Sequence, residues 1–321
     1  MKEILRVENI KKYFSKKNWY GKQLSIVRAV DDVSFSLDEG DVFVLAGESG
    51  SGKSTIAKII LQAIPRDGGR IVFDGTEIDG RKESVKKIRM QCQMVYQDPY
   101  DSINPQMKIK DIIAEPLEIY QKTNHVEKME SVKEVLREVR LEPVDEVIEK
   151  YPHELSGGQR QRVVLARALV LKPKLIIADE PVSMLDVSIR AEILELMENL
   201  RQKYHISFIY ITHDLTTARY FGKTLAILYM GKIVEIGPIN SVISNPRHPY
   251  TQALLDAILE PDPKNLYSVK KIRISEPTQV NVYEGCRFRS KCPYAFDKCS
   301  IEPPLEKIDD NRSVACFAKL E

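Results

Sequence analysis

The sequence predicts an α/β fold built around a parallel β-sheet, and three observations support this expectation. Two short apolar runs, Lys174–Asp179 and Ile206–Thr212, have the composition of strands that are buried on both faces. A helix with apolar residues at helical spacing, Ala191–Tyr204, lies between them. A glycine-rich loop at residues 47–54 lies between another predicted strand and another predicted helix.

Other segments continue this alternation and then depart from it. We expect further strands at Val33–Leu37, Asp41–Ala46 and Gln93–Gln97. The segment Ile109–Lys150 has many charges at helical spacing and no strand-like run, which predicts a helical subdomain inserted into the α/β core. After Gly237 the alternation fades and prolines gather, which indicates a small C-terminal appendage.

Length and composition exclude several classes of protein. The 321 residues suffice for two units at about 150 residues each. With 43% hydrophobic and 29% charged residues, the chain can bury a core, which excludes a wholly disordered protein. Forty-eight basic and 46 acidic residues nearly cancel, so net charge gives no reason to expect a nucleic-acid partner. Neither a secretory signal nor a run of 18 apolar residues is present, so a partner would have to supply any membrane span.

The first chemical motif fits the pattern G-x-x-x-x-G-K-[ST] and lies between a predicted strand and a predicted helix. It comprises Gly47, Glu48, Ser49, Gly50, Ser51, Gly52, Lys53 and Ser54, followed by Thr55. The glycines let backbone N–H groups point at phosphate, and the helix start adds positive potential. Lys53 would reach the outer phosphates and the Ser54 hydroxyl would ligate magnesium. The flanking elements disfavour a plain glycine-rich turn, but the motif by itself indicates only nucleotide binding.

The second motif is a buried strand, Leu175–Asp179, that ends in two adjacent carboxylates. Asp179 could hold magnesium, and Glu180 could orient and deprotonate an attacking water. A strand that ends in solvated acids is an equally common explanation of this pattern taken alone.

The third motif, Leu155-Ser156-Gly157-Gly158-Gln159, precedes a predicted helix from about Arg160 to Val170. A hydroxyl and glycine N–H groups at a helix start make a second phosphate cradle. Since the chain has no second glycine–lysine loop, we expect a head-to-tail pair in which each nucleotide lies between the loop of one chain and the Ser-Gly-Gly of the other. The alternative is an ordinary helix capped by Ser156.

With these motifs in this order, residues 3–237 resemble the ATP-binding subunits of ATP-binding-cassette (ABC) transporters. Gln97 matches the family's glutamine loop, and His213 matches its switch histidine. Asp186, in Ser183-Met184-Leu185-Asp186, matches the loop after the acidic pair. Phe14 falls where the family places an aromatic ring against adenine, although Tyr13 and Tyr20 compete for this role.

The resemblance implies both an architecture and a set of roles. Residues 1–237 would form a P-loop NTPase cassette with a RecA-like parallel-sheet core, an antiparallel β-subdomain and a helical subdomain at about 98–160. Residues 238–321 would form the C-terminal extension. The chain would bind ATP and Mg²⁺ and hydrolyse ATP, with Glu180, His213 and Gln97 as catalytic residues. The magnesium ligands would be Ser54, Gln97 and Asp179.

Two segments resemble the ATPases of dipeptide and oligopeptide importers, and more closely the second of the two paired ATPases. These are Arg247–Leu255 and Gln97–Pro105. The resemblance implies a peripheral protein at the cytoplasmic face of the cell membrane. Its partners would be a sister ATPase (a homodimer being possible in isolation), two permeases and an extracytoplasmic substrate-binding protein. Residues 98–118 would be the permease-facing surface, or else a solvated helical face.

The transported substrate is the least determined part of this interpretation. Peptides are the first expectation, and oligosaccharides or nickel are the alternatives. A soluble ABC ATPase acting on DNA or ribosomes is less favoured, because such proteins usually carry two cassettes or a long coiled coil. A mainly regulatory or redox-sensing protein is disfavoured by the complete set of catalytic motifs.

Four of the five cysteines, Cys286, Cys292, Cys299 and Cys316, lie within the last 36 residues. Without an export signal we do not expect disulfides, and four thiolates can ligate zinc or a [4Fe–4S] cluster. The wide spacings weaken the case for zinc. In the importer family this pattern is linked to an iron–sulfur cluster, which we favour over zinc or purely structural cysteines. Cys92, beside a predicted strand, is expected to be a buried core residue.

Overall fold

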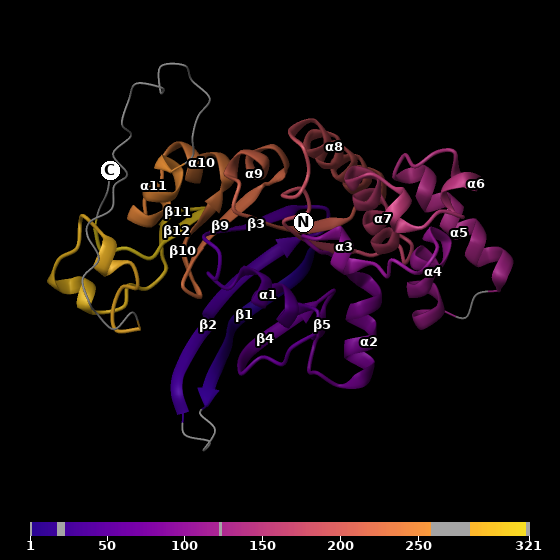
Figure 1. Ribbon diagram of the computed structural model, residues 1–321. Helices are drawn as coiled ribbons and strands as arrows, with labels where there is room; N and C mark the ends of the chain where they lie inside the picture. The colour runs from indigo at the N-terminus through magenta and orange to yellow at the C-terminus, as the bar shows by residue number, and fades with distance from the viewer. Residues whose placement is uncertain (1, 18–22, 122–123, 258–282, 319–321) are drawn as a thin grey trace, which may run out of the picture. The chain divides into compact units, whose positions relative to one another are not determined.

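The computed structural model describes residues 2–17, 23–121, 124–257 and 283–318 (Figure 1). The chain divides into two compact units, which are described separately. The first unit comprises residues 1–8, 34–42 and 57–211, and the second comprises residues 9–33, 43–56 and 212–321. No helix among the described residues is both long enough and apolar enough to cross a bilayer.

Three parallel strands form the core of the first unit: β6 (Cys92–Val95), β7 (Leu175–Asp179) and β8 (Ser207–Thr212). Every residue of β8, and every residue of β7 before Asp179, is buried, as expected for strands covered on both faces. The two apolar runs are therefore strands, as predicted. The helix between them, α8 (Val187–Tyr204), starts earlier than the sequence indicated and ends at a left-handed His205.

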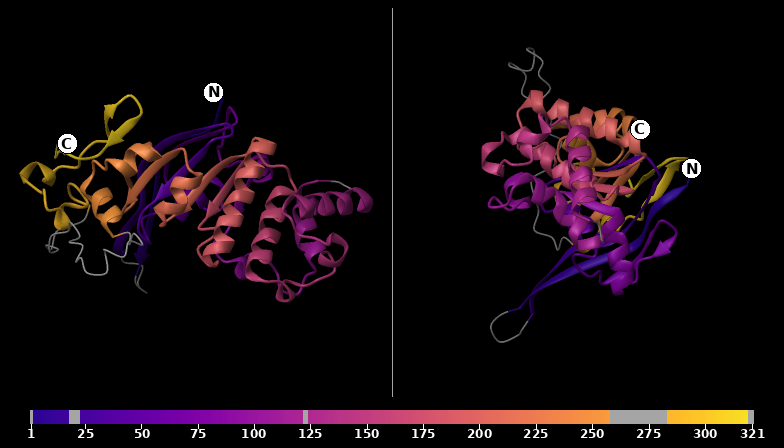
Figure 2. Two further views of the ribbon diagram at one scale, coloured as in Figure 1. Left: turned by 90° about the horizontal axis from the view of Figure 1, so that it is seen from above. Right: turned by 90° about the vertical axis from the view of Figure 1, so that its right-hand side faces the viewer.

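The segment predicted to be helical contains α3 (Pro99–Ser102), α4 (Ile109–Tyr120), α5 (His125–Glu138) and α6 (Val144–Val147). These magenta helices pack together in Figure 2, and α4 and α5 both contact α7 (Gly157–Leu169). The apolar face of α4 is buried, and Asn124 and Glu127 form a reciprocal capping box at the start of α5. Arg167 on α7 pairs with Glu115 on α4, with a nitrogen–oxygen distance of 2.6 Å.

The first unit also contains part of a four-stranded sheet whose strands lie in the order β2, β1, β4, β5. Its strands are β1 (Glu3–Lys17), β2 (Gln23–Asp38), β4 (Gly68–Phe73) and β5 (Thr76–Glu77), and helix α2 (Lys82–Gln91) follows. The β4–β5 pair is antiparallel. Residues 9–17 of β1 and 23–33 of β2 belong to the second unit. This sheet agrees with the β-subdomain that the family resemblance implied.

The second unit is built on β3 (Val42–Ala46) and β9 (Thr224–Tyr229), which pair in parallel. Antiparallel pairing then adds β10 (Lys232–Pro238), β12 (Arg312–Val314) and β11 (Glu306–Asp309) in that order. Its helices are α1 (Lys53–Ile60), α9 (Leu215–Phe221), α10 (Ile239–Ser244) and α11 (Pro249–Asp256), with short 3₁₀ turns at Arg289–Lys291 and Asp297–Ser300. The sequence did not predict β11 and β12. They are short and have one apolar residue each, so neither shows an apolar pattern.

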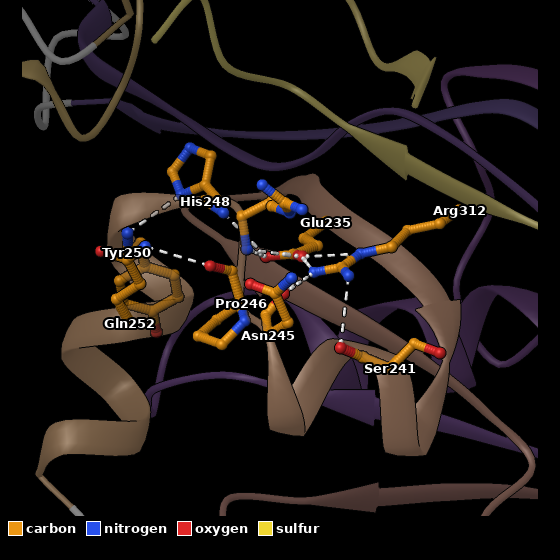
Figure 3. A network of polar contacts seen from close by, with 9 residues as sticks. Glu235, Ser241, Asn245, Pro246, His248, Tyr250, Gln252 and Arg312 are labelled. Carbon is orange, nitrogen blue, oxygen red and sulfur yellow. Dashed lines mark hydrogen bonds and ion pairs between the residues drawn. The ribbon is translucent and has the colours of Figure 1, made fainter. Parts of the chain in front are cut away.

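A buried ion pair joins the C-terminal strand β12 to β10 (Figure 3). The Glu235 carboxylate is completely buried and accepts hydrogen bonds from the Arg312 guanidinium. Its oxygens also accept the backbone N–H groups of Arg247 and His248 at 3.0 and 2.9 Å. Gly237 allows this packing, because a Cβ there would lie 2.9 Å from Arg312 Cγ. The appendage is thus integrated into the sheet of the second unit.

The first prediction concerns this ion pair. Arg312→Met should destabilise the protein by about 3–5 kcal/mol, because it leaves the buried Glu235 charge without its partner. Adding Glu235→Gln should recover part of the loss, since glutamine is neutral and still offers an oxygen to the two backbone N–H groups. Denaturant unfolding followed by circular dichroism measures both effects. Arg81→Met, at a side chain that is 85% exposed, is the matched control. Equal stability of Arg312→Met and Arg81→Met would contradict this account.

Candidate functional site

The glycine-rich loop connects β3 to α1, and its path depends on glycines at two points of close approach. Gly47 and Gly52 have φ values of +148° and +111°. A Cβ at Gly47 would lie 2.2 Å from the Leu228 carbonyl oxygen, and one at Gly52 would lie 2.1 Å from that of Ala29. Both distances are far below van der Waals contact, so no larger residue fits either position. The second unit thereby holds the loop in one shape.

The side chains of Lys53 and Ser51 are buried inside this loop. The Lys53 ammonium is buried and donates to the carbonyl oxygens of Gly47 and Glu48 at 2.7 and 2.9 Å. The Ser51 carbonyl accepts the N–H of Gly231 at 2.8 Å. The Ser51 hydroxyl is buried and has no hydrogen-bond partner in the described part of the chain. A buried hydroxyl of this kind is suited to a ligand. Ser54, at the start of α1, is exposed.

In the first unit, the structure brings Gln97 and Glu180 into direct contact. The Gln97 amide donates to Glu180 Oε2 at 2.9 Å across 83 residues of sequence. Glu180 has a left-handed backbone, with φ of +49°, which a non-glycine residue adopts only at a cost of about 1–3 kcal/mol. Its N–H donates to the Ile211 carbonyl at 2.9 Å, and its carbonyl accepts the Ser183 hydroxyl at 3.0 Å. The carboxylate directly follows Asp179 at the end of β7.

The Ser-Gly-Gly segment is the capped start of α7. Ser156 Oγ accepts the Gln159 N–H at 3.3 Å, and the Gln159 side chain accepts the Ser156 N–H at 3.0 Å. The simple capping explanation of Ser156 is therefore correct for this chain. Ser156 and Gln159 are also exposed, and a Cβ at Gly158 would lie 2.7 Å from Ile189 Cγ2. The capped turn is thus at the surface. Asp186, at the N-cap position of α8, is exposed as well.

His213 follows β8 in a turn of the second unit. The Asp214 carboxylate accepts the Thr216 N–H at 2.9 Å and caps α9, while the Thr212 hydroxyl accepts the Asp214 N–H at the same distance. These bonds fix the backbone on both sides of His213, and its imidazole is exposed.

The two aromatic residues Tyr13 and Phe14 of β1 differ in their contacts and exposure. The Tyr13 hydroxyl donates to the Asp31 carboxylate at 2.5 Å, and burial together with this bond raises the pKa of Tyr13 to about 12. Phe14 is 45% exposed, with the Lys12 ammonium 5.6 Å from its ring centre. Tyr20, the third candidate for an adenine contact, lies outside the described residues.

All four C-terminal cysteines line one small cavity in the second unit. None of the four forms a disulfide, and the apolar rings of Phe288 and Phe317 are among the other residues of the wall. Burial raises the pKa of the Cys292 and Cys316 thiols to about 11. Among the described residues, no group of three or more His, Cys, Asp or Glu side chains is arranged to hold a metal ion. Cys92 is buried, which raises the pKa of its thiol, in agreement with the predicted core position.

One contact at the glycine-rich loop was not anticipated. The Tyr250 hydroxyl accepts the backbone N–H of Glu48 at 3.0 Å, although 202 residues separate them in sequence. Tyr250 lies in the segment Arg247–Leu255, which served in the sequence only as a mark of family resemblance. A buried tyrosine hydroxyl needs a partner, but the sequence does not show which one.

Comparison with known proteins places this geometry in a family. A model described as "ABC transporter" matches residues 30–183, and one described as "Oligopeptide/dipeptide transporter, C-terminal region" matches residues 234–299. A probable peptide ABC transporter ATP-binding protein of Sinorhizobium fredii is 42% identical, over 98% of this chain and 90% of that protein. The oligopeptide transport ATP-binding protein OppF of Escherichia coli is 40% identical, over 98% of this chain and 96% of that protein.

Solved structures give the same result. The ATP-binding cassette MJ0796, in a dimeric post-hydrolysis structure bound to ADP and Pi, has a TM-score of 0.65 and 28% identity. The match covers 74% of this chain and 99% of that cassette. CbiO1 of Clostridium perfringens, part of the ABC transporter complex CbiONQ, has a TM-score of 0.65 and 25% identity, over 76% of this chain and 92% of that one. Together with the relatives that match 98% of its length, these structures show that the chain belongs to the ABC transporter family of ATP-binding proteins.

Proposed function

We propose that this chain is the ATP-hydrolysing subunit of an importer that carries dipeptides or oligopeptides across the cytoplasmic membrane. The observation that carries the proposal is the glycine-rich loop, in which Lys53 and a buried Ser51 hydroxyl, with no hydrogen-bond partner among the described residues, lie where phosphate would bind. The relatives that are named for peptide transport support peptides as the transported cargo. Oligosaccharides and nickel are the alternative cargoes, since cargo contacts the permeases and not this subunit.

In this proposal the second unit binds the triphosphate. Backbone N–H groups of Ser49, Gly50, Gly52 and Thr55, with those of the neighbouring loop residues, surround the phosphates as in other phosphate loops, while the Glu48 N–H stays bonded to the Tyr250 hydroxyl. Lys53 exchanges its carbonyl partners for phosphate oxygens, and Ser54 ligates Mg²⁺ together with Asp179 and Gln97. Mg²⁺ held by these residues would supply positive charge beside the phosphate oxygens. Phe14 is favoured for the adenine contact, because Tyr13 is engaged with Asp31.

The first unit supplies the group that activates water. Glu180 is the general base, and the Gln97 amide together with the backbone bonds of Glu180 fixes its carboxylate. The base takes a proton from water as the water oxygen attacks the γ-phosphorus and the bond to the ADP oxygen breaks. His213 donates a hydrogen bond to the γ-phosphate, and Asp186, at the N-cap position of α8, is a further nucleotide-binding residue.

A second chain completes the nucleotide site. Ser156, Gly157, Gly158 and Gln159 form a capped helix start in which Ser156 and Gln159 are exposed. This helix start offers N–H groups and positive potential to the phosphates of the opposite chain. MJ0796 was solved as a dimer with ADP and Pi, which supports this arrangement. The partner is a sister ATPase, or a second copy when the chain is isolated.

A cleft on the first unit fits the permease. It has a volume of about 290 Å³ and is lined by residues of β6, α4 and α7. Tyr96, Ile119 and Arg167 are among its wall residues, and Tyr96 directly precedes Gln97. Tyr100, within the predicted permease surface at 98–118, is 63% exposed, and the Arg160 guanidinium lies 4.1 Å from its ring centre. We assign this surface to the coupling helices of two permeases at the cytoplasmic face, with the substrate-binding protein on the opposite side.

The cysteine-lined cavity is assigned to a [4Fe–4S] cluster. Four thiols on one apolar cavity are the ligand set that such clusters use. Zinc, which needs four ligands around one atom, fits less well. When bound, the cluster would link distant parts of a small appendage through its bonds to the cysteine sulfurs.

The second prediction tests the glycine-rich loop. Gly52→Ala should weaken ATP binding at least tenfold, because the new Cβ would collide with the Ala29 carbonyl and displace the loop. Gly40→Ala is the matched control: Gly40 also has positive φ, at +76°, but nothing lies within 4 Å of its Cβ position. It should cost about 1–2 kcal/mol of stability and leave ATP affinity unchanged. Equilibrium titration with a fluorescent ATP analogue measures both variants. Equal ATP affinity of Gly52→Ala and wild type would contradict the assignment.

The third prediction tests the general base and the transport function together. Glu180→Gln should lower the ATP hydrolysis rate at least about 100-fold while preserving ATP binding, because only the base is lost. In cells that carry this substitution, uptake of labelled peptides should stop. Glu83→Gln, at an exposed carboxylate of α2, is the control. Unchanged hydrolysis would remove Glu180 from its role. Loss of oligosaccharide uptake with normal peptide uptake would contradict the proposed cargo.

The fourth prediction concerns the cysteines. Protein purified without oxygen should be brown and contain iron and sulfide in the stoichiometry of one [4Fe–4S] cluster per chain. Alanine at any of the four C-terminal cysteines should abolish the visible absorption, whereas Cys92→Ala should retain it. Colourless protein without iron would contradict the cluster, and stoichiometric zinc in its place would establish the alternative.

A further inference from the structure

Tyr250 connects the start of α11 to the glycine-rich loop. Its hydroxyl accepts the Glu48 N–H at 3.0 Å, and its side chain is 1% exposed. The backbone that carries Tyr250 is fixed, because His248 Nδ1 accepts the Tyr250 N–H at 3.0 Å and Glu235 accepts the His248 N–H at 2.9 Å (Figure 3). The hydroxyl is therefore held at one place against the loop.

The ring of Tyr250 belongs to an aromatic cluster that reaches the cysteine-lined cavity. Its centre lies 4.4 Å from that of Tyr229 and 5.5 Å from that of Phe288, while Tyr229 and Phe288 meet edge to face at 5.4 Å. Phe288 is 2% exposed and forms part of the cavity wall, two residues after Cys286. One buried ring therefore faces both the cavity and the tyrosine that contacts the loop.

A second connection runs from the neighbouring residue Arg287 to the same loop. The Arg287 guanidinium donates to the Met230 carbonyl in the β9–β10 turn and pairs with the buried Asp31 carboxylate. The next residue of that turn, Gly231, donates its N–H to the Ser51 carbonyl at 2.8 Å. The tripeptide Cys286-Arg287-Phe288 thus contacts the groups that support the loop at Glu48 and at Ser51.

We propose that Tyr250 is a positioning residue for the glycine-rich loop, and that the cysteine-bearing segment controls ATP affinity by holding Tyr250 through Phe288. This inference rests on the proposed ATP binding. A change that shifts the cysteine-lined cavity moves Phe288, and Phe288 moves the tyrosine ring. The Glu48 N–H then loses its acceptor, and the loop loses the shape that fits the phosphates.

The test is a double-substitution cycle in the full-length protein with the fluorescent probe N-methylanthraniloyl-ATP and Mg²⁺. Tyr250→Phe keeps the ring and removes the hydroxyl, and it should raise the dissociation constant about threefold to tenfold. Phe288→Leu keeps an apolar side chain and removes the ring contact, and it should have a similar effect. In the Tyr250→Phe background, Phe288→Leu should add no further loss of affinity, because both act through the same hydroxyl.

Controls separate this role from a purely structural one. Tyr220→Phe removes the hydroxyl of a tyrosine that is 64% exposed and should leave the dissociation constant unchanged. Thermal unfolding of every variant checks that it is folded, and Phe288→Met replaces Phe288→Leu if the latter is not. In steady state, Tyr250→Phe should raise KM for ATP and leave kcat within about twofold, a split that a general loss of folded protein would not produce.

Three results decide the matter. Equal affinity of Tyr250→Phe and wild type would overturn the positioning role. If Phe288→Leu lowers ATP affinity equally in the wild-type and Tyr250→Phe backgrounds, the connection through Phe288 would be overturned. If wild-type protein binds no probe at all, the proposed function fails, which is a different outcome from unaltered binding in the variants.

Discussion

The shape of the glycine-rich loop is the constraint on which the rest of the structure depends. Two backbone carbonyls, those of Leu228 and Ala29, lie so close to Gly47 and Gly52 that no Cβ fits. The loop therefore packs closely against its own unit, and the Lys53 ammonium is buried within it. Because a displaced loop would lose several phosphate contacts together, the elements that support it contribute to nucleotide binding without touching the nucleotide.

The C-terminal appendage is one of these supporting elements. Its strand β12 extends the sheet of the second unit at β10, and the Glu235–Arg312 pair fixes that junction without exposure to water. From there, α11 and the cysteine-bearing segment reach back to the loop through Tyr250 and Arg287. A region that contains few regular elements is thus held by charge pairs and aromatic rings, and it need not form a large core of its own.

Local patterns in the sequence predicted the parallel strands, the helical segment and the glycine-rich loop, because each depends on neighbouring residues. The runs that contain β7 and β8 are apolar throughout, and the loop motif specifies its own turn. The contacts Gln97–Glu180 and Glu48–Tyr250 join residues 83 and 202 positions apart, so no local pattern predicts them. The strands β11 and β12 were missed because they are short and have one apolar residue each, so neither sequence shows an apolar alternation. The capping role of Ser156, offered as the simpler explanation, is correct alongside the phosphate-binding role that we propose.

The central claim is that each nucleotide needs residues from two chains. The most direct test is the rate of ATP hydrolysis per subunit, measured as the protein is diluted. The sister ATPase is added if the chain alone does not hydrolyse ATP. The rate of the Glu180→Gln variant is subtracted as the background. The account predicts that the rate per subunit falls on dilution, as the pair dissociates and each loop loses the Ser156 turn of its partner. A full rate that persists in a solution of single subunits would contradict it.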